Sequence, residues 1–179
     1  YVCSPRDMTR AAGFYNTLLA GNDPAIVIEP LNGYRLKEKM PDNIGEYRIP
    51  LGIPEILNQG TDLTLVTYGS TVRVAAEAVR QLVLHDILVE LIDAQTLVPF
   101  DIHRVILGSL RKTNRLMLLD EDVPGGTTAY MMQEILEKQG GWNFLDSAPK
   151  TLTGKEHRPA YTTDGDYFSK PSAEDVFDA

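Results

Sequence analysis

Two short polar stretches carry residue types that could do chemistry, and each of them follows an apolar run. Tyr68-Gly69-Ser70-Thr71 combines a glycine with hydroxyl groups just before an expected helix, where unpaired backbone N–H groups attract anions. No phosphate-loop lysine and no Gly-x-Gly-x-x-Gly spacing accompany it, so a turn and helix cap is the favoured interpretation. Asp120-Glu121-Asp122 could bind a divalent metal or act as acid and base. Because side chains adjacent in sequence diverge, a solvated loop or a subunit-interface patch is favoured there.

The histidines and the cysteine indicate no further site. His85, His103 and His157 are the three histidines of the chain, and none lies at metal-ligand spacing from another ligand type. We expect them at the surface or at helix ends. Cys3 is the single cysteine, which excludes an internal disulfide and indicates a reducing, cytoplasmic compartment; we expect it to be buried. These residues alone predict no catalytic and no cofactor-binding residue.

The composition narrows the class of protein and of partner. The 179 residues are 43% hydrophobic and 23% charged, with a formal net charge of −8 at pH 7, which is typical of a globular protein of about one domain. The acidic balance argues against nucleic acid as a partner, and the apolar runs are too short to span a bilayer, so we expect no membrane partner. Because the chain starts without Met and stops within an expected helix, we also expect a piece of a longer protein.

The elements that would position these residues alternate between strands and helices. In residues 1–30, a strand end is followed by a helix that Ser4-Pro5 opens and 21–24 closes, and then by an apolar run at 25–28, as expected of a strand covered on both faces. This is a partial strand–helix–strand unit. Residues 31–60 are rich in proline and glycine and predict an ordered linker, with a short extended piece at Tyr47-Arg48-Ile49.

From residue 61 the alternation becomes regular. Strands are expected at 63–67, 87–92, 115–119 and 148–153, and helices between them. The second of these helices should follow a cap at Asp101 and carry Ile102 on its buried face. Strands separated by helices of this length need crossover connections. The pattern therefore predicts an α/β fold of three layers, αβα, with a mostly parallel sheet.

The order of several segments is more specific than any one motif. The segments that carry the likeness are Gly21-Asn22-Asp23-Pro24, Tyr47-Arg48-Ile49-Pro50-Leu51-Gly52, Gly60-Thr61-Asp62-Leu63-Thr64, Ile92-Asp93-Ala94-Gln95-Thr96-Leu97-Val98-Pro99-Phe100-Asp101 and Thr151-Leu152-Thr153-Gly154. In this order they resemble the C-terminal portion of the beta-type half of 2-oxo acid dehydrogenase decarboxylating components, which belong to the transketolase-like superfamily. Pro159-Ala160-Tyr161 keeps the family's Pro-x-Tyr pattern, whereas Asp120-Glu121-Asp122 replaces its frequent His-Glu-Ala.

The resemblance implies an organisation and an activity of the parent protein. Residues 1–30 would be a remnant of the pyrimidine-binding domain, 31–60 a linker, and 61–179 a transketolase-like C-terminal domain. The parent would use thiamine diphosphate and magnesium to decarboxylate a 2-oxo acid, branched-chain in preference to pyruvate, and pass the acyl group to a lipoyl group.

The resemblance also implies what this chain lacks and what it contacts. The family's catalytic groups lie upstream, and the alpha-type half holds the diphosphate and its magnesium, so the segment alone should be inactive. Its expected role is assembly, through contacts with the alpha-type half, with a second copy in a dimer and with the lipoyl acyltransferase core.

One metal site is implied by the family alone. Some members bind potassium through backbone carbonyls at a helix end, and the matching positions are Leu18, Leu19, Gly21 and Asp23. A helix closed by Gly21 without an ion is the favoured interpretation of the same residues.

Two other readings stay open. The first is the C-terminal domain of a transketolase or deoxyxylulose-phosphate synthase, whose sugar-phosphate substrates would favour basic residues near the site, whereas this segment is acidic overall. The second is a non-enzymatic binding module of flavodoxin-like or receiver-like fold.

Overall fold

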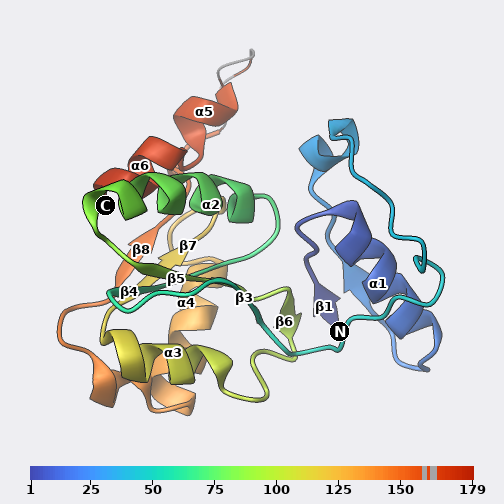
Figure 1. The fold of residues 1–179 in the computed structure, drawn as a ribbon, viewed down its shortest axis with the longest axis horizontal. Coiled ribbons are helices and arrows are strands. Elements are labelled where there is room, and N and C mark those ends of the chain that lie inside the picture. The colour runs from blue at the N-terminus through green and yellow to red at the C-terminus, as the bar shows by residue number, and fades with distance from the viewer. Residues whose placement is uncertain (159–160, 162–164) are drawn as a thin grey trace.

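The computed structural model describes residues 1–158, 161 and 165–179. Pro159 and Ala160 of the Pro-x-Tyr pattern therefore lie outside the described residues. The chain forms a small N-terminal unit and a larger domain built on a five-stranded sheet, and the two parts stand side by side (Figure 1).

The sheet of the larger domain is mostly parallel, which confirms the expected α/β class. Its strands are β3 (Glu55–Asn58), β4 (Leu63–Thr67), β5 (Val89–Asp93), β7 (Leu116–Leu119) and β8 (Lys150–Leu152). Their order across the sheet is β3-β5-β4-β7-β8. From β5 to β8 neighbouring strands run parallel, and β3 pairs antiparallel with β5 at one edge.

Helices cover both faces of this sheet and give the three expected layers. α2 (Thr71–Leu82) and α6 (Ala173–Asp178) lie on one face, and α3 (Val105–Thr113), α4 (Thr127–Met132) and the π-helical turn η3 (Gln133–Lys138) on the other (Figure 1). Leu65 packs with the α2 side and its neighbour Val66 with the α3 side. Successive strand residues point to opposite faces, so burial of both faces explains why adjacent residues such as Leu65 and Val66 are both apolar. The short helices are η2 (Val83–His85), η4 (Gly141–Phe144) and α5 (Gly165–Ser169).

The start of α3 differs in detail from the expectation. Asp101 does cap the helix, since its carboxylate accepts hydrogen bonds from the N–H groups of Val105 at 2.7 Å and Ile106 at 2.9 Å. The helix begins only at Val105, because Arg104 has a positive φ of 56°. The prediction that Ile102 is buried was wrong: it lies in the preceding turn and is 54% exposed.

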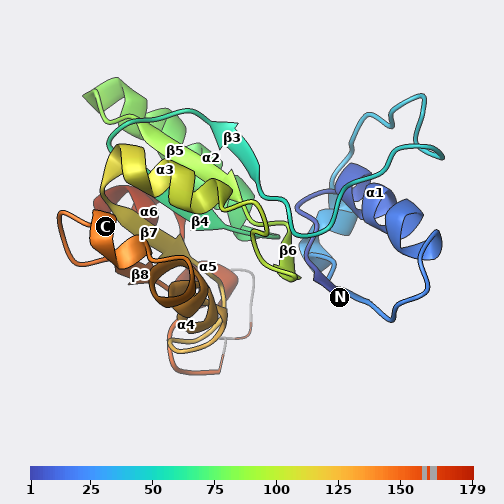
Figure 2. The same cartoon turned by 90° about the horizontal axis from the view of Figure 1, so that it is seen from below.

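The connecting segment ends inside the sheet of the larger domain. The extended piece expected at 47–49 is not a strand, whereas residues 55–58 form β3. Figure 2 shows this segment passing from α1 to β3. β3 pairs with β5, and its Glu55 accepts hydrogen bonds from Arg6, just before α1, and from Arg10 in α1. The local sequence pattern does not indicate these partners.

The N-terminal unit consists of β1 (Val2–Cys3), α1 (Met8–Leu19), β2 (Ile26–Val27) and the turn η1 (Leu31–Arg35). The expectation that Ser4-Pro5 opens the helix was wrong. The cap is Asp7, whose carboxylate accepts from the N–H of Arg10 at 2.7 Å, as short acidic residues do at this position. β2 is also not covered on both faces, since Ile26 is 63% exposed.

A strand that the sequence pattern did not indicate joins the two parts. β6 (Thr96–Val98) follows β5 and pairs antiparallel with β1, which in turn pairs parallel with β2. The resulting three-stranded sheet has the order β2-β1-β6. The backbone of the larger domain thereby continues into the N-terminal unit. Within the described residues, no helix combines the length and the apolar character needed to cross a membrane.

Gly60 and Gly108 give a matched test of the packing at the edge of β5. A Cβ on Gly60 would lie 2.2 Å from the backbone carbon of Val89, whereas one on Gly108, an exposed position of α3, would meet nothing within 4 Å. We expect Gly60→Ala to destabilise the chain by about 3 kcal/mol because backbone must shift, and Gly108→Ala to stabilise it by roughly 0.5–1 kcal/mol. Urea unfolding followed by circular dichroism measures both. Equal effects of the two substitutions would contradict the described approach of Gly60 to β5.

Candidate functional site

The strand order creates a point where the chain turns in opposite directions across the sheet. From β4 the chain passes through α2 to β5 on one side, and β7 and β8 lie on the other side of β4. In open α/β sheets, ligands bind beyond the carboxyl ends of the strands at such a point. A cleft of about 660 Å³ lies there, between the ends of β4 and β7 and the segment that follows β2.

The cleft brings together the two polar stretches that the sequence offered separately. Tyr68, Gly69 and Ser70 line it after β4, and Asp120-Glu121-Asp122 line it after β7. The Tyr68 hydroxyl donates to Asp120 Oδ1 at 2.9 Å. The two stretches are far apart in the sequence and meet because β4 and β7 are neighbours in the sheet.

The acidic stretch does not behave as one solvated loop. Its side chains diverge as expected: Glu121 pairs with Lys170 at 2.9 Å near the surface, whereas Asp120 is only 2% exposed. The expectation of a solvated loop was therefore wrong for Asp120. Its Oδ1 also accepts from the N–H of Asp122 at 3.2 Å, and this turn draws the carboxylate inward.

The segment after β4 forms the expected turn, but the expected helix cap at Ser70 is absent. Gly69 has a φ of +59°, and a Cβ there would come within 2.8 Å of Ser4 Oγ, so only glycine fits this turn. Ser70 forms no side-chain cap; Thr71 Oγ1 instead donates to the Tyr68 carbonyl at 2.8 Å. The turn is thus shaped by its contact with the N-terminal unit and by Thr71.

Burial sets the electrostatics of the cleft floor. Burial raises the pKa of Asp120, opposed by the hydrogen bonds from Asp122 and Tyr68. It also raises the pKa of Tyr68, so this hydroxyl stays a donor. Asp120 Oδ2 is buried and has no hydrogen-bond partner among the described residues. The cleft therefore contains a buried acceptor that is unsatisfied.

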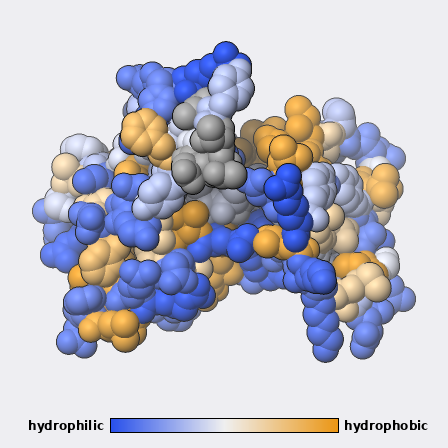
Figure 3. Space-filling model, turned by 90° about the horizontal axis from the view of Figure 1, so that it is seen from above, coloured by the Kyte–Doolittle hydropathy of each residue, from blue (hydrophilic) through white to orange (hydrophobic). Residues whose placement is uncertain are grey.

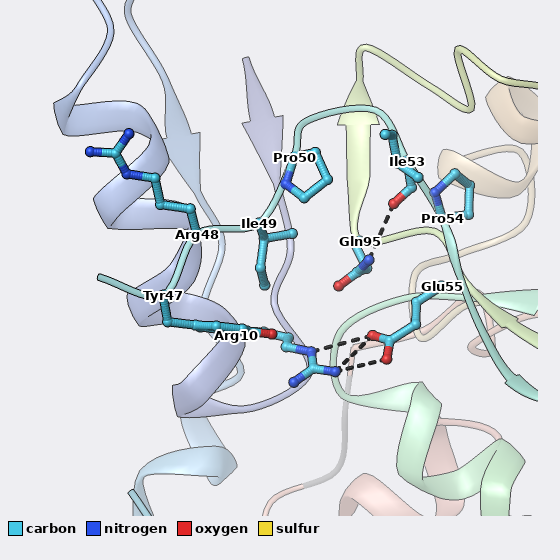
Figure 4. A pocket seen from close by; sticks show the side chains of 9 residues that line it. All are labelled: Arg10, Tyr47, Arg48, Ile49, Pro50, Ile53, Pro54, Glu55 and Gln95. Atoms are coloured by element: carbon cyan, nitrogen blue, oxygen red, sulfur yellow. Dashed lines mark hydrogen bonds and ion pairs between the residues drawn. The ribbon is translucent and has the colours of Figure 1, made fainter. Parts of the chain in front are cut away.

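A second, smaller pocket lies at the junction of the two parts. Figure 4 shows Arg10 and Glu55 pointing toward each other across it, whereas Arg48 points away. The pocket has a volume of about 240 Å³, and Arg10 Nη2 lies 2.8 Å from Glu55 Oε1. The Gln95 side chain enters the same pocket and donates to the Ile53 carbonyl at 3.2 Å.

Arg6 extends this junction to a fully buried acid. Its Nη1 lies 2.8 Å from Glu55 Oε2 and 2.7 Å from Asp93 Oδ2, and the Asp93 side chain is 0% exposed. Burial raises the pKa of Asp93 to about 6, although Arg6 opposes this. For Glu55, burial is outweighed by hydrogen bonds from Arg6 and Arg10, which lower its pKa.

No sequence motif indicates this junction, although a buried acid and two nearby arginines are visible in the sequence. Asp93 ends a strand that is buried along its whole length, where a charged side chain needs a partner. Arg6 and Arg10 are four residues apart, a spacing that places both near one face of a helix. The sequence alone did not indicate that Asp93 would pair with Arg6.

The histidines and Cys3 lie where they were expected. The His85 ring packs edge-on against Phe177 with centroids 5.4 Å apart, and His157 packs against Phe168 at 5.6 Å. Cys3 is fully buried, and burial raises the pKa of its thiol to about 11. Among the residues that the structure describes, no group of three or more His, Cys, Asp and Glu could hold a metal ion.

The positions matched to a potassium site lie at the end of α1 and in the turn that follows, namely Leu18, Leu19, Gly21 and Asp23. The N–H groups of Ala20 and Gly21 both donate to the Leu18 carbonyl. The Asp23 carboxylate accepts from the Tyr1 hydroxyl at 2.9 Å. The helix therefore ends at Ala20 with hydrogen bonds to the Leu18 carbonyl, and Gly21 does not adopt the left-handed conformation of a glycine cap; the ion stays a prediction.

Removing Arg6 tests the junction. We expect Arg6→Gln to destabilise the chain at pH 7 by on the order of 3 kcal/mol, because it leaves the buried Asp93 carboxylate without its counter-charge. The matched control is Arg48→Gln, since Arg48 is exposed and points away from Glu55; it should change stability by less than about 0.5 kcal/mol. Urea unfolding measures both variants.

The same pair of variants has a defined pH dependence. Asp93 has a pKa of about 6 in the folded chain against about 3.9 when unfolded, so its ionisation destabilises the fold as pH rises through that window. Without Arg6 this pKa rises further, and Glu55 loses a partner that lowers its pKa. Below about pH 6 Asp93 is protonated in both folded chains, so its contribution to the Arg6→Gln penalty should grow only as pH rises through about 6 and above, where Asp93 ionises in the wild-type chain alone. A penalty independent of pH would contradict the ion pair.

Comparison with known proteins agrees with this geometry. Residues 52–176 match the family "Transketolase, C-terminal domain". The chain is 34% identical over 155 residues to pyruvate dehydrogenase E1 component subunit beta of Acholeplasma laidlawii, covering 86% of this chain and 46% of that protein. It is also 34% identical over 155 residues to acetoin:2,6-dichlorophenolindophenol oxidoreductase subunit beta of Bacillus subtilis (strain 168), covering 87% of this chain and 44% of that protein.

A solved structure agrees in fold. An inactive beta4 tetramer of a split-gene transketolase superposes with a TM-score of 0.73 at 20% identity, covering 99% of this chain and 54% of that one. The chain thus spans about half the length of the relatives that it matches. The three-layer fold and the matched range show that the chain belongs to the transketolase C-terminal domain family.

Proposed function

We propose that this chain is the assembly portion of a thiamine-diphosphate-dependent 2-oxo acid dehydrogenase decarboxylating component. In this proposal the parent is an oxidoreductase that decarboxylates a 2-oxo acid and passes the acyl group to a lipoyl group. The observation that carries the proposal is the family match over residues 52–176 together with beta-subunit relatives that are 34% identical. The family match gives no support to a flavodoxin-like or receiver-like module.

The chain's own contribution is mechanical in this proposal. The pairing of β1 with β6 and the ion pairs of Arg6 hold the N-terminal unit in one position relative to the larger sheet. An upstream active site built on that unit would therefore be fixed relative to the C-terminal domain.

Surface character supports a role in assembly. Apolar side chains are exposed on both parts of the molecule, and Figure 3 shows them among polar ones. Highly exposed examples are Leu19, Leu31, Met40, Leu84 and Trp142. Apolar surface of this kind is suited to protein contacts, which we assign to the alpha-type half, a second copy of the chain and the lipoyl acyltransferase core.

The described residues do not fit the cofactor of the parent. Thiamine diphosphate carries a diphosphate with magnesium, and the described part of the chain contains no group of three or more His, Cys, Asp and Glu that could hold a metal ion. The larger cleft is lined by Asp120, Glu121 and Asp122, which repel a diphosphate. We therefore place the cofactor and its magnesium outside this segment and assign the segment no catalytic residue.

The substrate of the parent is a finer part of the proposal. We favour a branched-chain 2-oxo acid over pyruvate. A relative from Arabidopsis thaliana is named 2-oxoisovalerate dehydrogenase subunit beta 2, mitochondrial, and is 33% identical over 139 residues, covering 76% of this chain and 38% of that protein. The transketolase or deoxyxylulose-phosphate synthase alternative has no support beyond the shared fold, and its test is turnover of a ketose phosphate.

We also propose a cytoplasmic location for the protein. The support is the single cysteine of the chain, which indicates a reducing compartment. Fractionation of the source cells with an antibody to the chain tests this, and recovery in a membrane or secreted fraction would contradict it.

Activity of the parent tests the main proposal. The protein that contains this sequence, purified with its alpha-type half and supplied with thiamine diphosphate and magnesium, should release carbon dioxide from a 2-oxo acid. We expect faster release from 2-oxoisovalerate than from pyruvate, with acetoin cleavage as a third assay. Release from none of these substrates, or turnover of a ketose phosphate instead, would overturn the assignment.

Ligand addition to the 179-residue chain tests its own binding capacity. Isothermal calorimetry with thiamine diphosphate and magnesium should give no heat of binding, and micromolar affinity would contradict the placement outside the segment.

Thermal unfolding of the same chain tests the potassium site. The midpoint of unfolding should be equal in sodium and potassium chloride, as expected of a helix end that holds no ion. A rise specific to potassium would instead support an ion at Leu18, Leu19, Gly21 and Asp23, because a ligand that binds only the folded state stabilises it.

A further inference from the structure

The two parts of the molecule meet at polar contacts around a buried acid. We propose that this junction is a proton-controlled hinge: with a proton on Asp93 the two parts stay together, and without it the N-terminal unit opens away from the larger domain more readily. The proposal rests on the separate cores of the two parts, on the contacts that join them and on the charges around Asp93. It concerns this chain alone and does not depend on the proposed function, so either can fail by itself.

Each part has a hydrophobic core of its own. The core of the N-terminal unit contains Cys3, Phe14 and Ile49. Among the described residues, these three belong to neither core cluster of the larger domain. The chain passes from one part to the other between Leu51, which packs on the N-terminal core, and Gly52, whose N–H donates to Thr96 Oγ1 at 2.8 Å. Because the described cores are separate, the two parts can move relative to each other with both cores intact.

The contacts that join the two parts lie close to Asp93. Just after β1, the Ser4 N–H donates to the Gln95 carbonyl at 2.8 Å. Arg6 of the N-terminal unit places its Nη1 2.7 Å from Asp93 Oδ2, and the Asp93 side chain is fully buried. When the N-terminal unit opens, Arg6 leaves with it and water takes its place. Asp93 is therefore buried in the closed junction and hydrated in the open one.

The charges around Asp93 do not balance while it is ionised. The charged groups that face it or its partners come from the segment before α1, from α1 and from β3, and are Arg6, Asp7, Arg10 and Glu55. On its other side, β4 pairs the uncharged Thr67 with it. With Asp93 ionised, the carboxylates of Asp7, Glu55 and Asp93 outnumber the guanidinium groups of Arg6 and Arg10. A proton on Asp93 balances the cluster, and an excess charge is costly to bury.

The direction of the effect follows from the two environments of Asp93. In the closed junction, burial raises its pKa to about 6, although Arg6 opposes this. In the open junction a hydrated aspartate has a pKa of about 3.9. Because the pKa is higher in the closed state, Asp93 favours closure fully below about pH 4, and this preference is lost as pH rises through about 6.

Glu55 acts in the opposite sense but outside this pH range. Its burial is outweighed by the hydrogen bonds from Arg6 and Arg10, so its pKa is lowered in the closed junction. A group of this kind favours closure above its ordinary pKa of about 4.3 and loses that effect as pH falls. Between about pH 5 and about pH 7 the response of the hinge therefore comes from Asp93.

The hinge also acts on the larger cleft. Ile28, Pro30 and Leu31 line that cleft from the N-terminal unit, whereas Tyr68 and Asp120 line it from the larger domain. Opening moves one wall away from the other, so the hinge couples the shape of the cleft to pH.

Amide hydrogen exchange of the wild-type chain, followed by NMR, tests the hinge. The Ser4 amide reports the junction, and the Thr64 amide, which donates to the Arg115 carbonyl at 2.9 Å, reports the larger sheet. The observed rate divided by the intrinsic rate gives an opening constant for each amide, which removes the direct effect of pH on exchange. We expect the constant at Ser4 to exceed that at Thr64 at least about tenfold, because the junction opens without unfolding the sheet.

The constant at Ser4 should also rise about tenfold between about pH 5 and about pH 7, as pKa values of about 6 and about 3.9 in the two states require. Equal opening constants at Ser4 and Thr64 would show that the junction opens only when the whole chain unfolds, and would overturn the proposal. A constant at Ser4 that stays level or falls as pH rises would overturn it as well.

A pair of variants tests Asp93 itself. Asp93→Asn keeps the size of the side chain and cannot ionise, so the opening constant at Ser4 should change less than about twofold over the same pH range. The control Asp146→Asn removes an exposed carboxyl group of the larger domain and should leave the tenfold rise in place. Circular dichroism establishes that each variant is folded. A folded Asp93→Asn variant that keeps the tenfold rise contradicts the proposal, and the wild-type pH series decides it should that variant not fold.

Discussion

The arrangement of the two parts depends on one buried charge, the carboxylate of Asp93. An ionised acid at the end of a strand that is buried on both faces is stable only beside a counter-charge. Arg6 supplies it at 2.7 Å from the neighbouring unit and also reaches Glu55 on β3. The same interaction therefore fixes the segment before α1, the edge strand β3 and the end of β5 relative to one another. Pairing of β1 with β6 adds backbone hydrogen bonds to the same junction.

The candidate cleft is a consequence of that junction. Its floor comes from the ends of β4 and β7, but one wall comes from the segment after β2. Ser4, two residues before Arg6, lies against Gly69 and leaves no room for a side chain there. The shape of the cleft and the position of the N-terminal unit are thus physically coupled.

The elements of the larger domain were predictable because its helices and strands have distinct periodicities. Short segments rich in apolar and β-branched residues predicted β4, β5 and β7, and the helical spacing around Ala75 and Val79 predicted α2. The order of segments predicted the family. The strands β3 and β6 were missed because each is stabilised by partners from another part of the chain, β3 by β5 and Arg6, β6 by β1. The start of α1 was misplaced because two caps were available, and only Asp7 accepts from the helix.

The sequence by itself determined the class of fold, the apolar layers and the family, since these follow from local periodicity and from the order of segments. It also determined which residue types could do chemistry after β4 and β7. Tertiary structure alone decided that Tyr68 meets Asp120 and that Asp93 meets Arg6. These contacts join residues that are far apart in the chain, and burial rather than residue type gives the acids their properties. Neither the neighbours of a side chain nor its exposure to water is encoded in a single local pattern, because both arise only when the strands and units pack together.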